Sequence, residues 1–140
     1  MTLINDVKAA RFEIELKKYF IPADKDQRAL ARVLDTDYNK AVVLAAKSEK
    51  LARRSLKKIE RMTVPAKYAA LKADVVEVLH LTVKAMELVP AVAGGKVSHL
   101  HHKMAFLTHM REVRTYTEYS KQEIEFLTGG KYVASNSVLD

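Results

Sequence analysis

Four residues have the types and the spacing of a metal site in a helical bundle. Glu77 and His80 read Glu-x-x-His, the form in which ferritin-like bundles present two metal ligands from one helical turn. His109 and Glu112 read His-x-x-Glu on a later segment, and an antiparallel turn near Gly94 would bring His80 level with His109. A helical wheel sets Glu77 and His80 on the polar side of their segment, where solvated side chains are the simpler interpretation. The sequence therefore offers a metal hypothesis but predicts no cofactor.

Five basic residues recur at steps of three and four: Lys47, Lys50, Arg54, Lys57 and Arg61. On a helix this spacing forms one stripe, which we call the basic stripe, opposite the small residues of the same segment. Such a stripe can follow phosphates or an acidic protein surface through counterion release. It also fits a solvated helix face, because no Gly-rich phosphate loop is present and no aromatic residues are interleaved for base stacking. Both interpretations stay open.

The composition excludes several other kinds of chemistry. The chain of 140 residues has no Cys, which removes thiol nucleophiles, disulfide scaffolds, Cys-based zinc sites and iron–sulfur clusters. No Gly-x-Ser-x-Gly, Walker or Gly-x-Gly-x-x-Gly motif is present. A net charge of +7 with 49% hydrophobic residues is typical of one soluble globular domain. We therefore expect a protein that is not an enzyme.

Glycine and proline divide the chain into long segments that favour helices. All of them lie in four places: Pro22, 63–65, 90–95 and 129–130. The expected helices run over about 5–20, 24–62, 65–90 and 96–128. Thr63 is the expected cap of the third helix, and a capping signal at 35–37 leaves open a break within the second.

Each segment carries apolar residues at helical spacing. The second has a heptad seam of mostly small residues, which lets a partner helix approach closely: Ala41, Ala45, Ser48, Ala52, Ser55, Ile59 and Met62. The stripe of the third consists of Tyr68, Leu71, Val75, Leu79, Thr82, Met86 and Val89. For the first we expect Val7, Ala10 and Ile14 to face the core, with Leu16 or Tyr19 on the same side. For the fourth we expect Leu100, Met104, Leu107, Met110, Val113, Thr117, Ile124 and Leu127.

Short connections between long amphipathic helices favour antiparallel neighbours. We therefore expect a single all-α domain over residues 1–130, an antiparallel up-and-down bundle of four helices of which the first is the shortest. A three-helix hairpin with an N-terminal arm is the alternative. Residues 131–140 have no helical period and are expected to form a flexible tail.

The stretch from Leu56 to Tyr68, followed by a helix and then Gly94-Gly95, resembles uncharacterised helical-bundle proteins of Gram-positive bacteria. Many of those look like small surface lipoproteins. Their pattern combines a basic amphipathic helix, a hydroxyl or apolar residue with Val-Pro, a nearby aromatic residue and a long return hairpin. This sequence lacks the signal peptide and the lipidation Cys of the lipoprotein pattern. The resemblance implies a bundle and no catalytic residue.

These observations predict binding rather than catalysis. We expect a protein-interaction or scaffold protein, able to self-associate where a short first helix leaves the heptad seam uncovered. Its partner would be another protein or a second copy. Polyanion or nucleic-acid binding through the basic stripe is the alternative, and a bundle metalloprotein is the second alternative.

No apolar run in the sequence is long enough to span a membrane, and the N-terminus lacks the apolar region of a signal peptide. A cytoplasmic location is therefore expected. The alternative is an exported protein whose signal peptide is not part of this sequence.

Overall fold

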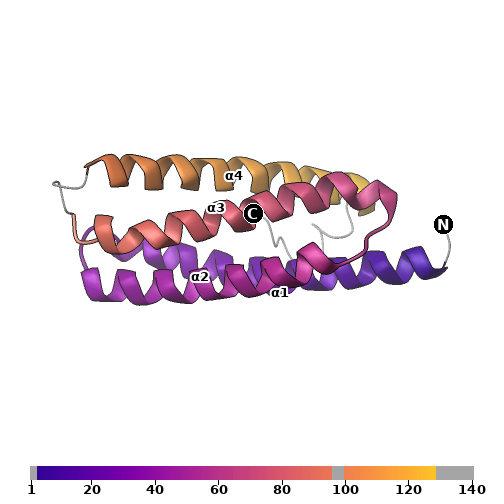
Figure 1. Ribbon diagram of the computed structural model, residues 1–140, viewed down its shortest axis with the longest axis horizontal. Helices are drawn as coiled ribbons and strands as arrows, with labels where there is room; N and C mark the ends of the chain where they lie inside the picture. Colours follow the sequence, from indigo (N-terminus) through magenta and orange to yellow (C-terminus); the bar gives the residue numbers. More distant parts are fainter. Residues whose placement is uncertain (1–2, 96–99, 129–140) are drawn as a thin grey trace.

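The computed structural model describes residues 3–95 and 100–128, and within these ranges it has four long helices. They are α1 (Leu3–Val33), α2 (Tyr38–Arg61), α3 (Ala69–Val92) and α4 (Leu100–Thr128), with a short 3-10 turn, η1 (Ala66–Tyr68), before α3. Consecutive helices pack on each other and alternate in direction, with their axes side by side along the molecule (Figure 1). This arrangement confirms the all-α up-and-down bundle of four helices. The expected tail at 131–140 lies outside the described residues.

α1 is the longest helix rather than the shortest, because it continues through Pro22. Pro22 has no N–H to give to the carbonyl of Lys18 one turn earlier, and in a helix interior this costs about 3 kcal/mol. Buried side chains lie on both sides of it, including Tyr19, Phe20 and Ala23. Both halves of α1 therefore pack on the same core, and their burial offsets the lost hydrogen bond. The expected helix ends at residues 20 and 24 are wrong.

The chain turns between α1 and α2 at residues 35–37, where the sequence has a capping signal and a break was one of two possibilities. Asp37 has an extended backbone, with φ −134°, and its carboxylate accepts a hydrogen bond from the Lys40 amide at 3.1 Å. The Asp37 amide donates in turn to the carbonyl of Val33 at 2.9 Å. The break at 35–37 is therefore confirmed, and the expected long second helix is split between α1 and α2.

Both ends of α3 differ from the expectation. Pro65, rather than Thr63, occupies the cap of η1, and no side chain makes a capping hydrogen bond there. Pro90 lies inside α3, which ends two residues later at Val92. Gly94 then adopts φ +78°, a left-handed conformation that favours glycine, and its amide donates to the carbonyl of Leu34 at 2.8 Å. This bond ties the end of α3 to the turn between α1 and α2.

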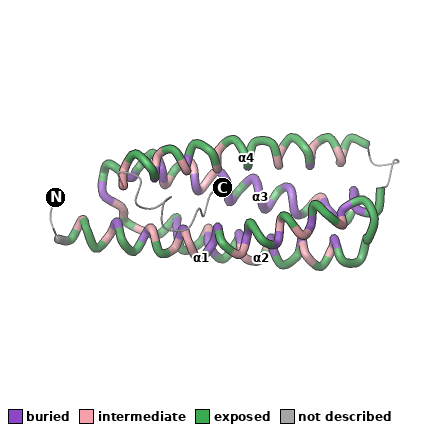
Figure 2. The backbone as a smooth tube through the Cα atoms, turned by 180° about the vertical axis from the view of Figure 1, so that it is seen from behind, coloured by how far each residue is buried: buried purple, intermediate pink, exposed green. Residues whose placement is uncertain are grey.

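The core runs along α3, which is buried on several sides because α2 and α4 both cover it (Figure 2). All seven residues of the predicted third stripe are buried. Six of the seven residues of the heptad seam, all except Met62, are buried as well, so α1 and α3 fill the seam within one chain. The idea that a short first helix leaves the seam open to a partner is therefore wrong. Tyr68 closes one end of the core, since its ring meets Phe12 edge-on at 6.2 Å and its hydroxyl donates to Glu13 at 3.1 Å.

The predicted stripes of α1 and α4 are only partly buried. In α1 the expected Leu16 and Tyr19 are buried, in one line with Ala9, Phe12, Ala23 and Leu30, whereas the expected Val7, Ala10 and Ile14 are exposed. In α4 the predicted Val113 and Ile124 are buried, with Phe106 and Ser120, but Leu100, Met104 and Leu107 are exposed. Aromatic side chains bury the largest apolar area, so the line of α1 that contains them takes the inner face. None of the helices described has the length and apolarity to cross a bilayer.

Candidate interaction surfaces

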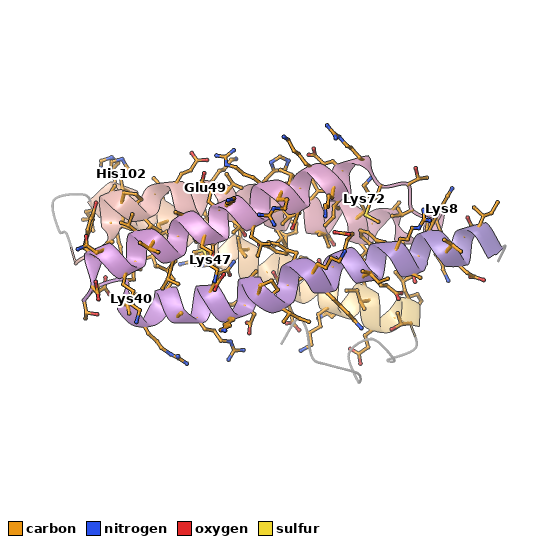
Figure 3. The ribbon with its side chains drawn as sticks, turned by 90° about the horizontal axis from the view of Figure 1, so that it is seen from below. Lys8, Lys40, Lys47, Glu49, Lys72 and His102 are labelled. Atoms are coloured by element: carbon orange, nitrogen blue, oxygen red, sulfur yellow. The ribbon has the colours of Figure 1, made fainter. Side chains whose placement is uncertain are left out.

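The basic stripe lies on the outer face of α2, and all five of its residues are exposed. α2 contains eight Lys and Arg against two Glu. Lys47 points toward α1 (Figure 3). Its Nζ lies 3.3 Å from Oδ1 of the buried Asp26. The other four members, Lys50, Arg54, Lys57 and Arg61, point to solvent along one side of the helix. The five residues of the basic stripe therefore lie on one exposed face of α2, and one of them, Lys47, forms an ion pair with Asp26 of the same chain.

The two acidic residues of α2 face α3 instead of the basic stripe. Glu49 accepts from Arg53 Nε at 2.9 Å, and Arg53 Nη2 reaches Glu87 of α3 at 2.8 Å. The hydrogen bond to Glu49 is the main cause that raises the pKa of Arg53. Glu60 lies 3.3 Å from Nε2 of His80, again on α3. Because the carboxylates of α2 are engaged on this side, its outer face stays basic.

A groove runs between α1 and the C-terminal half of α2. One hollow of about 390 Å³ is lined by Arg11, Ile14, Glu15, Lys18, Lys58 and Met62. A second of about 250 Å³ continues from it, since Arg11 and Met62 line both, and adds Lys8 and Thr63. We call these two hollows together the α1–α2 groove. Sequence reasoning missed it because Val7 and Ile14 were assigned to the core; with Ile21 they recur every seventh residue on the outer side of α1.

A second exposed apolar line lies on α4 and is called here the α4 outer face. It consists of Leu100, Met104 and Leu107, which are 61%, 61% and 47% exposed. Their steps of four and three place them together, on the side of α4 turned away from the buried Phe106 and Val113. The same spacing made them look like core residues in the sequence.

A hollow of about 450 Å³ lies between the start of α3 and the end of α4, with Asp74 and Glu123 among its lining residues. Burial raises the pKa of Glu123 to about 7, and a hydrogen bond with Asp74 and the charge of Asp74 act in the same direction. Sequence reasoning could not find this pair, because the two residues lie on different helices and belong to no motif. A carboxyl with a pKa of about 7 therefore lies at the contact between α3 and α4.

The four residues of the metal hypothesis do not converge on one point. His80 is exposed and lies beside Glu60 of α2, while Glu77 and His109 are half-buried and Glu112 is exposed. Within 3–95 and 100–128, no three His, Asp or Glu side chains are close enough together to hold a metal ion.

Comparison with known proteins assigns no role to these surfaces. Comparison with protein-family models, curated proteins and solved structures found no match for this chain. What the protein does must therefore be argued from its own surfaces.

Proposed function

We propose that this chain is a non-enzymatic helical-bundle protein that binds another protein, or a second copy of itself, through the α4 outer face. The observation that carries this proposal is the exposed line of Leu100, Met104 and Leu107. Large apolar side chains at heptad spacing supply the knobs that a facing helix packs around. A contiguous apolar patch of this kind on a folded surface marks an interaction site more often than isolated exposed residues do.

The position of α4 in the bundle supports this assignment. α3 lies between α2 and α4, whereas α4 packs mainly on α3 and so keeps an outward side. The heptad seam of α2 is filled by the chain itself and has no room for a partner helix. A protein partner would therefore bind at an outer helix and leave the interior unchanged.

Sedimentation velocity over a wide concentration range tests the proposal. We expect the wild-type chain to exceed its monomer mass of 15.8 kDa as concentration rises, or to bind a partner protein in solution. The triple variant Leu100→Gln/Met104→Gln/Leu107→Gln should lose this association. Val43→Gln is the control, because Val43 is 67% exposed on α2 and lies outside the α4 outer face. A strict monomer that captures no more protein than the triple variant would count against the proposal.

The second candidate function is polyanion binding by the basic stripe. It is favoured by the exposure of Lys50, Arg54, Lys57 and Arg61 on a helix whose two Glu face elsewhere. Titration with DNA and RNA at several salt concentrations tests it, since each neutralised phosphate contributes a slope of about −0.9 to log K against log salt. Replacing those four residues by Gln should remove the binding, whereas Arg111→Gln/Arg114→Gln on α4 should retain most of it. Absence of salt-dependent binding would end this candidate.

A further inference from the structure

We propose that the α1–α2 groove binds an acidic amphipathic helix of a partner protein. This site is separate from the α4 outer face and goes beyond the function proposed above. The proposal rests on three properties of the groove: its charge, its apolar floor and its concave shape.

The charge of the groove requires an acidic occupant. Four cations line it, Lys8, Arg11, Lys18 and Lys58, against the single carboxylate of Glu15. Glu15 lies 3.4 Å from Lys18 and neutralises that side chain only. A second copy of this chain, with its net charge of +7, is therefore a poor occupant.

The apolar residues of the groove favour an occupant that has apolar side chains as well as negative charge. Ile14 lines the larger hollow and is 54% exposed, and Met62 lines both hollows and is half-buried. Val7 and Ile21 extend this line along α1, and each step of seven residues advances about 10 Å along the helix. A partner helix with apolar residues at heptad spacing would meet these side chains one after another, as in helix-in-groove recognition.

The shape and lining of the groove favour a peptide helix over a nucleic acid or a membrane. None of its lining residues is aromatic, so bases would find nothing to stack on. A phosphate group would gain no favourable contact from the apolar side chain of Ile14, whereas the apolar side of a partner helix would bury that side chain. A bilayer surface is flat and is reached by protruding apolar side chains, but Ile14 and Met62 line a hollow between two helices.

Binding of a designed peptide to the full-length chain tests the proposal. The probe is a fluorescently labelled three-heptad helix with Leu at its a and d positions and mainly Glu elsewhere. A scrambled peptide of identical composition keeps the charge and loses the apolar face. We expect saturable binding of one peptide per chain in fluorescence anisotropy, with the scrambled peptide at least about tenfold weaker.

Two variants and two matched controls locate the binding. Ile14→Gln removes the more exposed of the two apolar side chains that line the groove, and Arg11→Gln/Lys58→Gln removes two of its cations. Each change should weaken binding of the peptide by about fivefold or more. Val43→Gln and Arg111→Gln/Arg114→Gln make the same chemical changes elsewhere and should change the affinity less than about twofold. Circular dichroism checks that every variant keeps its helix content.

Several outcomes would overturn the assignment. The amphipathic peptide could fail to bind, the scrambled peptide could bind equally well, or the controls could weaken binding as much as the groove variants. Single-stranded DNA or phosphatidylserine vesicles that bind in an Ile14-dependent way would assign the groove to a different class of partner. The triple α4 variant should bind the peptide normally, so this proposal and the proposed function can fail separately.

Discussion

The buried carboxylate of Asp26 on α1 is paired with the exposed ammonium of Lys47 on α2, at 3.3 Å. The side chain of Asp26 is 6% exposed and that of Lys47 is 67% exposed. The other carboxylate oxygen, Oδ2, has no hydrogen-bond partner in the part of the chain that the structure describes. Lys47 therefore compensates the burial of a charge, and the basic stripe has one free cation fewer than its sequence indicates.

We predict that Lys47→Met lowers the free energy of unfolding by about 1–3 kcal/mol, because it leaves a buried carboxylate without its ion pair. Urea denaturation measures this change. Lys50→Met, also exposed on α2, is the control and should stay within about 0.5 kcal/mol of the wild type. The double variant Asp26→Leu/Lys47→Met should recover most of the loss, since it removes both charges. Equal effects of Lys47→Met and Lys50→Met would show that the pair contributes nothing.

Pro22 offers a test of the continuous α1. Pro22→Ala restores an amide that can donate to the carbonyl of Lys18, so we expect the free energy of unfolding to rise by about 1–3 kcal/mol. Thermal and urea denaturation would both show the gain. A loss of stability would mean that α1 needs the proline, for example because the helix bends there to follow the core.

The heptad seam predicts opposite effects for two neighbouring substitutions. Ser48 is buried and its hydroxyl has no partner within the described residues, so Ser48→Ala should raise the free energy of unfolding by up to about 1 kcal/mol. Ala52 is completely buried one turn later, and Ala52→Leu should lower it by about 1–3 kcal/mol through overpacking. Chemical denaturation of both variants measures the two signs. Tolerance of Ala52→Leu would show that α1 and α3 leave space along the seam.

Glu123 predicts a pH dependence of stability. Its pKa is raised to about 7 in the folded chain, first by burial and then by Asp74, so the folded state binds this proton more tightly than the unfolded state does. The resulting stabilisation is fully present below the unfolded pKa of 4.5 and is lost as the pH rises through about 7. Urea denaturation at pH 5 and pH 8, chosen to bracket the transition at about 7, should show this fall.

Glu123→Gln should remove that part of the pH dependence and make the chain more stable than the wild type at pH 8. Because Glu123 is only half-buried and solvent screens its charge, the effect should be below about 1 kcal/mol. Asp74→Asn should lower the pKa of Glu123, which an NMR titration of its side-chain carboxyl would measure directly. Glu125→Gln is the control, since it removes an exposed carboxylate from the same helix. An unchanged Glu123 pKa in Asp74→Asn would leave burial as the whole cause.

Local sequence was sufficient wherever the deciding physics is local. Gly94 and Gly95 mark a turn because they adopt positive φ, and Asp37 begins α2 because its side chain can accept from an amide one turn later. The all-α class, the heptad seam of α2 and the stripe of α3 follow from helical periodicity. The structure buries the whole stripe and every seam residue except Met62. The stripe of α3 is buried in full, since most residues of this helix are apolar and its neighbours cover it on more than one side.

Tertiary packing decided what periodicity leaves open. α1 and α4 each have two apolar lines at heptad spacing, and a period indicates which residues share a face but not which face a neighbouring helix covers. Phe12 and Tyr19 pack in the core, and Ile14 therefore lies on an exposed side of α1. In that position Ile14 lines the α1–α2 groove. The same non-local burial carries α1 through Pro22 and brings Asp26 to Lys47. The sequence by itself determined the all-α class, the breaks at 35–37 and 94–95 and the buried faces of α2 and α3. The contacts between helices determined how far α1 extends and which faces of α1 and α4 stay exposed.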